Sequence, residues 1–180
     1  MRRTRSRLPR SRTLAGVPLV FLLALCAGVA PDRAAAQDDG IALGSVVQPF
    51  TIEDLDGEAV DLAEVIGRKP VLVEFWATWC PVCRVLDPKL AAAHSRFGDE
   101  VEFLVVAVGV GQRKEQIAAH IARHPVAGRL LWDGRGAAAR AFEAPGTGYV
   151  VLLDAAGKVV WTGTGTGQDI DGALQRLVSR

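Results

Sequence analysis

Cysteine is scarce in this sequence, with three residues in 180. Cys26 lies in an N-terminal segment that we expect to be removed, which leaves Cys80 and Cys83 in the motif "CPVC". This pair has three candidate roles: a structural crosslink, half of a metal site, or a redox couple. A disulfide between the two would close a loop of only about four residues and stabilise the fold little, which argues against a crosslink.

Histidine is equally scarce, which bears on the metal-site role. Zinc sites are almost always tetrahedral, so the cysteine pair would need two further ligands. The candidates are His94, His120 and His124. His120 and His124 have ligand-like spacing on one predicted helix, but no third or fourth ligand accompanies them, and a solvated helix face accounts for the pair. We therefore predict neither a metal site nor a cofactor.

The first 36 residues have the pattern of a secretory signal peptide. "MRRTRSRLPRSR" carries six arginines and no acid, residues 14–30 are apolar, and residues 34–36 are three alanines. We expect cleavage after Ala36, a mature domain of residues 37–180, and a periplasmic or other extracytoplasmic location. The alternative is an uncleaved membrane anchor, for which the apolar run of 17 residues is short and contains Pro18.

The mature domain has no excess of positive charge. Removing seven of the 21 basic residues and one of the 20 acidic residues leaves 14 and 19, a net charge of −5. Such a domain has no electrostatic footprint for nucleic acid, so nucleic acid is not a predicted partner. Residues 37–180 also lack a long linker, a repeat or a low-complexity segment, which predicts one domain.

Strands and helices alternate along residues 37–180. Apolar runs at 70–77 and 101–110 predict central strands that are buried on both faces. The other expected elements are a hairpin at 48–62, helices at 81–97, 114–124 and 136–142, a strand at 128–133, a hairpin at 149–165 and a closing helix at 168–180. This order predicts an α/β fold in which helices flank a central mixed β-sheet, in three layers.

Cys80 stands where a buried strand is expected to end and a helix to begin, with Pro81 in the first helical turn. A thiol reacts as its thiolate, and the free N–H groups and positive dipole end of a first turn favour an anion. We therefore expect an exposed Cys80 to attack a partner's disulfide. The more shielded Cys83, one turn further along, would resolve the mixed disulfide.

Glu74 places an acid inside the apolar strand, six residues before Cys80. Burial of a carboxyl group raises its pKa. An acid that is half-protonated behind a thiol can shuttle the proton that thiol–disulfide exchange requires. The alternative is a glutamate that is bonded to water and has no role in exchange. Trp76 is expected to be a packing residue, and Trp79 to line the surface on which a partner docks.

"VLVEFWATWCPVCRVLDPKL" resembles the thioredoxin family in its acid, its Trp-Cys pair and its kink proline, here Glu74, Trp79–Cys80 and Pro88. The exported start and the later "LLDAAGKVV" extend the resemblance, over residues 43 to about 178, to the TlpA/ResA-type periplasmic branch. It implies a thioredoxin-like three-layer sandwich and an exported thiol–disulfide oxidoreductase that reduces partner proteins, for example during cytochrome c maturation. The implied partners are protein disulfides or thiols and a membrane electron donor.

Three positions depart from that family pattern. Val82 and Leu86 replace a proline and a glutamate, and Gly148, after Thr147, stands where the family has a cis-proline. We expect Thr147 and Gly148 to lie against the cysteines and, with Trp79 and Pro81, to contact a bound partner. Because glycine leaves the loop more freedom, Gly148→Pro is expected to stiffen it and raise activity.

Three other functions are weighed against the oxidoreductase. A metal-binding or metal-delivering module on the same scaffold would exploit a looser loop over the sulfurs. A peroxidase would need a threonine three residues before the reactive cysteine, where this chain has Ala77. A domain whose main work is binding another protein is the third.

Overall fold

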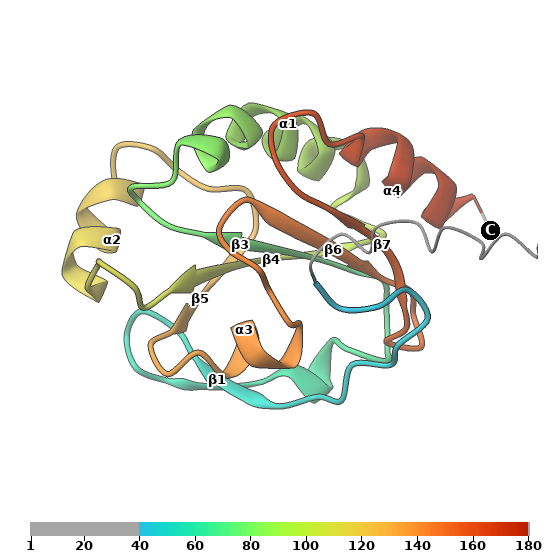
Figure 1. The fold of residues 1–180 in the computed structure, drawn as a ribbon, viewed down its shortest axis with the longest axis horizontal. Helices are drawn as coiled ribbons and strands as arrows, with labels where there is room; N and C mark the ends of the chain where they lie inside the picture. Colours follow the sequence, from blue (N-terminus) through green and yellow to red (C-terminus); the bar gives the residue numbers. More distant parts are fainter. Residues whose placement is uncertain (1–39, 180) are drawn as a thin grey trace, which may run out of the picture. The chain divides into compact units, whose positions relative to one another are not determined.

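The computed structural model describes residues 40–179, so the predicted signal peptide and its cleavage site lie outside the described residues. The strands in this range are β1 (Thr51–Glu53), β2 (Ala59–Asp61), β3 (Val71–Trp76), β4 (Glu102–Val108), β5 (Arg129–Asp133), β6 (Tyr149–Leu153) and β7 (Val159–Gly163). They form one sheet in the order β2-β1-β5-β4-β3-β6-β7 (Figure 1). β4 pairs in parallel with β3 and β5, whereas β6 pairs antiparallel with β3, so the sheet is mixed as predicted.

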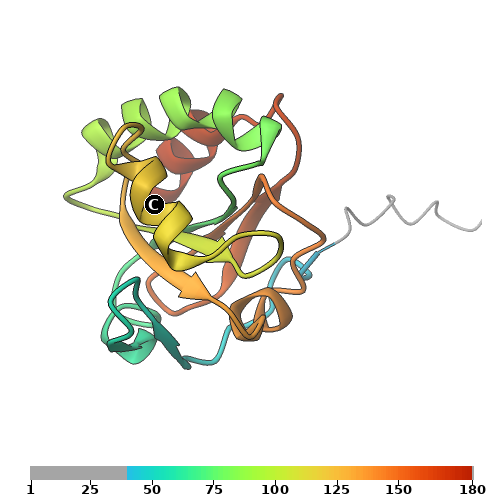
Figure 2. The same cartoon turned by 90° about the vertical axis from the view of Figure 1, so that its left-hand side faces the viewer.

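Helices cover both faces of this sheet (Figures 1 and 2). The helices are α1 (Pro81–Phe97), α2 (Lys114–Ile121), α3 (Ala137–Ala141) and α4 (Ile170–Val178), with a short 3-10 helix at Leu62–Glu64. Side chains of α1, α2 and α4 pack on one face, and those of α3 pack on the other. The three-layer α/β architecture is therefore confirmed. Within residues 40–179, no helix has the length and apolar content to cross a membrane.

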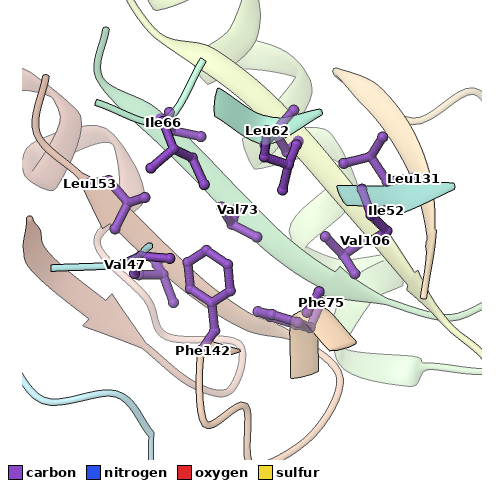
Figure 3. Close-up of a cluster of buried hydrophobic side chains, with 14 of the residues drawn as sticks. Val47, Ile52, Leu62, Ile66, Val73, Phe75, Val106, Leu131, Phe142 and Leu153 are labelled. Atoms are coloured by element: carbon purple, nitrogen blue, oxygen red, sulfur yellow. The ribbon is translucent and has the colours of Figure 1, made fainter. Parts of the chain in front are cut away.

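β3 is buried along its whole length and separates the two apolar layers. Side chains alternate between the faces of a strand. Val73 and Phe75 point into the layer that contains Phe142, which follows α3 (Figure 3). Leu72 and Trp76 point into the other layer, which lies under α1 and α2. Glu74 therefore projects from the same face as Leu72 and Trp76, beneath the helix that carries the cysteines.

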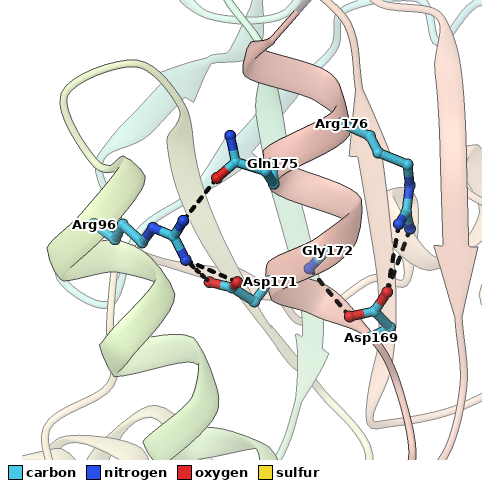
Figure 4. A network of polar contacts seen from close by, with 6 residues as sticks. All are labelled: Arg96, Asp169, Asp171, Gly172, Gln175 and Arg176. Atoms are coloured by element: carbon cyan, nitrogen blue, oxygen red, sulfur yellow. Dashed lines mark hydrogen bonds and ion pairs between the residues drawn. The ribbon is translucent and has the colours of Figure 1, made fainter.

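α4 is tied to the far end of α1 by a polar network (Figure 4). Arg96 donates from Nη1 to both carboxylate oxygens of Asp171, at 2.9 and 2.8 Å, and from Nη2 to Gln175 Oε1 at 2.7 Å. Asp169 caps the start of α4 by accepting the Gly172 N–H at 3.1 Å. The exposed ion pair between Arg96 and Asp171 contributes at most about 1 kcal/mol to the free energy of unfolding. The orientation of α1 on the sheet is set mainly by its apolar side chains, among them Leu86 and Leu90.

The segment before β1 covers part of the sheet face on which α3 packs. Val46 pairs antiparallel with Lys158, and the Val47 N–H donates to Gly157 O at 3.0 Å. Val47 is buried in the same layer as Phe75. The apolar periodicity of the sequence does not predict this contact, because it joins an irregular segment to a turn more than a hundred residues away.

Candidate active site

Cys80 and Cys83 form a disulfide at the start of α1, with their Cα atoms 5.3 Å apart. β3 ends at Trp76, and the Cys80 N–H donates to Ala77 O at 3.0 Å to close the turn that leads into the helix. Cys80 is the N-cap, and its Sγ accepts the Cys83 N–H at 3.0 Å. Pro81 occupies the first helical position, where its missing N–H would have no partner in the helix. The expected junction of strand and helix is present.

Both cysteines are buried, with 1% of Cys80 and none of Cys83 exposed. The expectation of an exposed Cys80 is therefore wrong for the disulfide form. A bond to Cys83, which faces the core one turn on, draws the Cys80 sulfur inward. The sulfurs lie in an apolar cluster that includes Trp76, Ile117 and the β4 residues Val105 and Ala107.

Trp79 lies at the surface next to the disulfide, with 46% of its area exposed. Its indole Nε1 donates to Val110 O at 2.9 Å. Trp79 forms one wall of a cavity of about 500 Å³ that Thr147 and Arg135 also line. The sequence predicts Trp79 and Thr147 at this surface but not Val110 and Arg135, which lie in loops that follow β4 and β5. Their position after two parallel strands is the signal that could have found them, since loops at that edge meet in space.

Gly148 lies against Val82, the second of the two residues between the cysteines. A Cβ atom on Gly148 would stand 2.5 Å from Val82 Cγ1 and 2.9 Å from Val82 Cβ. The Gly148 N–H donates to Phe75 O at 2.7 Å, and its φ is +76°. The expected approach of this loop to the cysteine motif is thus present. No cis peptide bond occurs in residues 40–179.

These contacts argue against the expectation that Gly148→Pro raises activity. Proline fixes φ near −65° and has no N–H, so it fits neither the positive φ nor the hydrogen bond of this position. Its ring would also overlap Val82. The positive φ of Gly148 and the closeness of the Val82 side chain both favour glycine at this point.

Gln168 holds the same loop from the other side, and the sequence analysis missed it. Its Nε2 donates to Gly148 O and to Gly165 O, both at 2.7 Å. Gln168 is 8% exposed, and within the described range its Oε1 has no hydrogen-bond partner. One feature of the sequence could have identified Gln168: it is an amide residue that stands between a glycine-rich loop and the N-cap of the last helix.

Glu74 is 1% exposed, as predicted. Burial, and then repulsion from Asp87, raises the pKa of Glu74 to about 8. Among the described residues, nothing hydrogen-bonds its Oε1. Burial also raises the pKa of Asp87, against the opposing effects of His120 and of a hydrogen bond from the Trp76 side chain. At neutral pH the Glu74 carboxyl group is therefore mainly protonated.

His120 and His124 form more than a solvated helix face. The His120 ring meets the buried Trp76 ring edge to face at 5.4 Å and lies 5.0 Å from the His124 ring. His94 is separate from them and packs on Phe103 at 5.0 Å. Within residues 40–179, no three His, Cys, Asp or Glu side chains are grouped to hold a metal ion. The metal-binding alternative is not favoured.

The chain is similar in sequence to known redox proteins. A family model described as Redoxin matches residues 42–177. Thiol-disulfide oxidoreductase ResA of Bacillus subtilis is 30% identical over 132 residues, which are 73% of this chain and 72% of ResA. Thiol:disulfide interchange protein DsbE of Tatumella citrea is 32% identical over 112 residues, 57% of each chain.

Solved structures are similar in fold. The thioredoxin domain of a thiol-disulfide oxidoreductase from Bacteroides vulgatus superposes with a TM-score of 0.66 at 26% identity, over 77% of this chain and 99% of that one. A secreted disulfide oxidoreductase of Mycobacterium tuberculosis gives a TM-score of 0.62 at 23% identity, over 71% and 96% of the two chains. The predicted thioredoxin-like fold is confirmed.

Proposed function

The chain belongs to the Redoxin family and is a thiol–disulfide oxidoreductase of the thioredoxin type, and from this premise we propose that it is exported and reduces disulfides of partner proteins through Cys80 and Cys83. The observation that carries the proposal is the disulfide at the start of α1, in which Cys80 Sγ accepts the Cys83 N–H. When the disulfide is open, the same N–H and the helix dipole favour a thiolate on Cys80.

The proposed exchange has two steps. The Cys80 thiolate attacks one sulfur of a partner's disulfide, forms a mixed disulfide, and releases the other partner sulfur as a thiolate that takes a proton from water. Cys83 then loses its proton and attacks Cys80 Sγ. The Cys80–Cys83 bond forms, the bond to the partner breaks, and the partner leaves with both of its cysteines reduced.

The burial of the disulfide supports the reducing direction. A disulfide is uncharged and apolar, whereas the reduced pair must keep two thiols, or a thiol and a thiolate, in the cluster around Trp76 and Ile117. Glu74 adds an acid, not a base, to the same side of β3. A strong oxidant depends on a stabilised reduced form, and these surroundings favour the oxidised form instead.

A partner is expected to dock over Trp79, Pro81, Thr147 and Gly148. Trp79 and Thr147 line one cavity, and Pro81 is exposed at the start of α1. Export through the signal at residues 1–36 would bring this surface to extracytoplasmic proteins, and a membrane electron donor would return the disulfide to the reduced state. The mass of the protein recovered from its producing cells tests cleavage after Ala36.

Trapping of mixed disulfides tests the proposed roles. Reduced Cys83→Ser protein, when mixed with a disulfide-bonded partner or with oxidised glutathione, should keep one half of that disulfide bonded to Cys80, because the resolving thiol is absent. Cys80→Ser should hold far less, and Cys80→Ser/Cys83→Ser none. If Cys80→Ser were the better trap, the assignment of the attacking cysteine would be reversed. If neither variant trapped a disulfide, the exchange function itself would be wrong.

A further inference from the structure

A buried amide side chain joins the loop that follows β4 to the turn that precedes Cys80. Gln112 is 7% exposed, and its Oε1 accepts the Thr78 N–H at 2.9 Å and the Thr78 hydroxyl at 3.0 Å. Its Nε2 donates to Val108 O at 2.7 Å. A polar group is costly to bury unless it is hydrogen-bonded, and these bonds offset that cost. Gln112 has no part in the exchange steps described above.

The loop that ends at Gln112 has a glycine on either side of Val110. Gly111 has a φ of +68°, a conformation that favours glycine. Val110 is 70% exposed at the centre of the loop, so its own side chain does little to fix its position. The start of the loop is bonded to β5, where the Gly109 N–H donates to Asp133 O at 3.2 Å. The bonds of Gln112 fix the other end.

The position of this loop determines where the Trp79 ring lies. The Trp79 indole Nε1 donates to Val110 O at 2.9 Å. A Cβ atom on Gly111 would stand 3.3 Å from the same Nε1, so the loop and the ring are in close contact. Trp79 directly follows Thr78, which is bonded to Gln112. Thr78 and Trp79, neighbours in the active-site turn, are thus both bonded to this loop.

Trp79 and this loop form one wall of the cavity of about 500 Å³ described above. Val108, Gly109 and Val110 line the cavity together with Trp79. A partner that docks there meets the exposed ring, and ordering a mobile side chain on binding lowers affinity. Because the ring and the loop are already bonded to each other, that ordering is complete before the partner arrives.

We propose that Gln112 is a positioning residue for partner recognition, which fixes the loop after β4 and thereby keeps Trp79 in the orientation that a protein disulfide substrate meets. This inference rests on the proposed exchange function. Gln112 acts through Trp79 and not on the sulfurs. Its loss should therefore slow the reaction with a protein that covers the cavity, and spare the reaction with a small disulfide that meets only the sulfur of Cys80.

The comparison to make is between a large and a small disulfide. Reduced protein is mixed with insulin or with hydroxyethyl disulfide, quenched with acid at set times and alkylated, and mass spectrometry measures the fraction in which Cys80 and Cys83 are oxidised. Gln112→Leu removes the bonds to Thr78 and Val108 in a side chain of similar size. We expect its second-order rate constant to fall about threefold to tenfold with insulin, as for the ordering of one side chain on binding, and to change less than about twofold with hydroxyethyl disulfide.

Two further variants separate positioning from a general loss of structure. Trp79→Ala should itself slow the reaction with insulin, and Gln112→Leu should cause little further loss in that background, because both changes act on one feature. Gln112→Glu should keep more of the insulin rate than Gln112→Leu, since its carboxyl group can still accept both bonds from Thr78. The matched control is Gln116→Leu, on an exposed amide that accepts the Arg113 N–H at 2.9 Å, and it should leave both rate constants unchanged.

A loss of less than about threefold with insulin in Gln112→Leu would overturn the proposal. Equal slowing with both disulfides would overturn it too, because the effect would then lie on the sulfurs or on the fold. If Gln112→Leu did not fold, Thr78→Val, which removes the hydroxyl bond alone, makes the same comparison, and an unchanged ratio of the two rate constants would contradict the proposal. If the unsubstituted protein reacted with neither disulfide, the exchange function would fail instead, so the two failures are distinguishable.

Discussion

The disulfide lies between two flanks that differ in how they are built. The glycine flank consists of Val82, Gly148 and Gln168, where Val82 leaves no room for a Cβ atom on Gly148 and the polar groups of Gly148 are both hydrogen-bonded. The acid flank consists of Glu74, Asp87 and His120, which are all titratable, and burial is the largest cause of the pKa shift of each.

The difference predicts two kinds of response to substitution. Changes in the glycine flank alter shape and hydrogen bonding, neither of which depends on protonation, so their cost should be the same at every pH. Changes in the acid flank alter charge, so their effect should vary with pH. One flank therefore holds the loop at Gly148 through contacts that do not titrate, and the other flank carries groups that do.

Gly148→Pro should have the largest effect on stability. It removes the hydrogen bond to Phe75 O, cannot adopt φ +76° and overlaps Val82. We expect a loss of about 3 kcal/mol or more in the free energy of unfolding, measured by urea denaturation. The loss should be equal at about pH 6 and pH 8. A Gly148→Pro protein as stable as the original would show that the glycine flank does not constrain the loop.

A double-mutant cycle sharpens this result. Gly148→Ala should destabilise the protein by about 1–3 kcal/mol through its positive φ and its contact with Val82. Val82→Ala removes both methyl carbons beyond Cβ and should relieve part of that cost. We expect the double variant to be less destabilised than the sum of the single variants, by about 0.5 kcal/mol or more.

Glu74→Gln should change how stability depends on pH. The pKa of Glu74 is about 8 in the folded protein, against an ordinary value of 4.5 for a glutamate. The folded state thus holds a proton that the unfolded state has lost, and unfolding becomes easier as pH rises from about 4.5 to 8. Glu74→Gln should remove this slope and should be more stable than the original by about 1 kcal/mol or more at pH 8. Parallel stability curves for the two proteins would contradict the raised pKa.

Glu100→Gln is the matched control, because Glu100 is an exposed acid just after α1. It should leave the pH slope unchanged. In the same experiment, the glycine-flank variants should shift the curve vertically without altering its slope.

The sequence predicted the elements around both flanks but only part of their contacts. Apolar runs identified β3 and β4, and an acid within such a run identified Glu74 as buried. The position of Cys80 at a helix start was also correct. Its burial was not, because exposure depends on where the disulfide points and not on the order of elements.

Contacts between distant segments account for what the sequence left unpredicted. Gln168 reaches Gly148 across 20 residues, and the Thr78 N–H donates to Gln112 Oε1 across 34 at 2.9 Å. The sequence predicts that His120 is a surface residue, because its helix is short and is polar on the face that carries it. His120 comes close to Trp76 and Asp87 only in the folded chain, so no local sequence pattern predicts the acid flank.

Gln168→Leu should have the smallest effect of the series. It leaves the carbonyl groups of Gly148 and Gly165 without their amide donor, which costs about 1–2 kcal/mol in the free energy of unfolding. Reduction of a protein disulfide such as insulin should slow, since the partner-facing loop is less well held. Gln175→Leu, at an exposed amide that contacts Arg96, is the control and should cost about 0.5 kcal/mol or less. Equal effects of the two variants would remove Gln168 from the glycine flank.

Redox titration of the purified protein tests the central claim most directly. The protein is equilibrated in glutathione buffers of stepped ratio, quenched with acid and alkylated, and the alkylated cysteines are counted by mass spectrometry. The account predicts that Cys80 and Cys83 become alkylatable together, as one two-electron couple, at a potential nearer to that of a reductant such as thioredoxin, about −270 mV, than to that of an oxidant such as DsbA, about −120 mV. Thiols that stay free in the most oxidising buffer, or two cysteines that titrate separately, would contradict it.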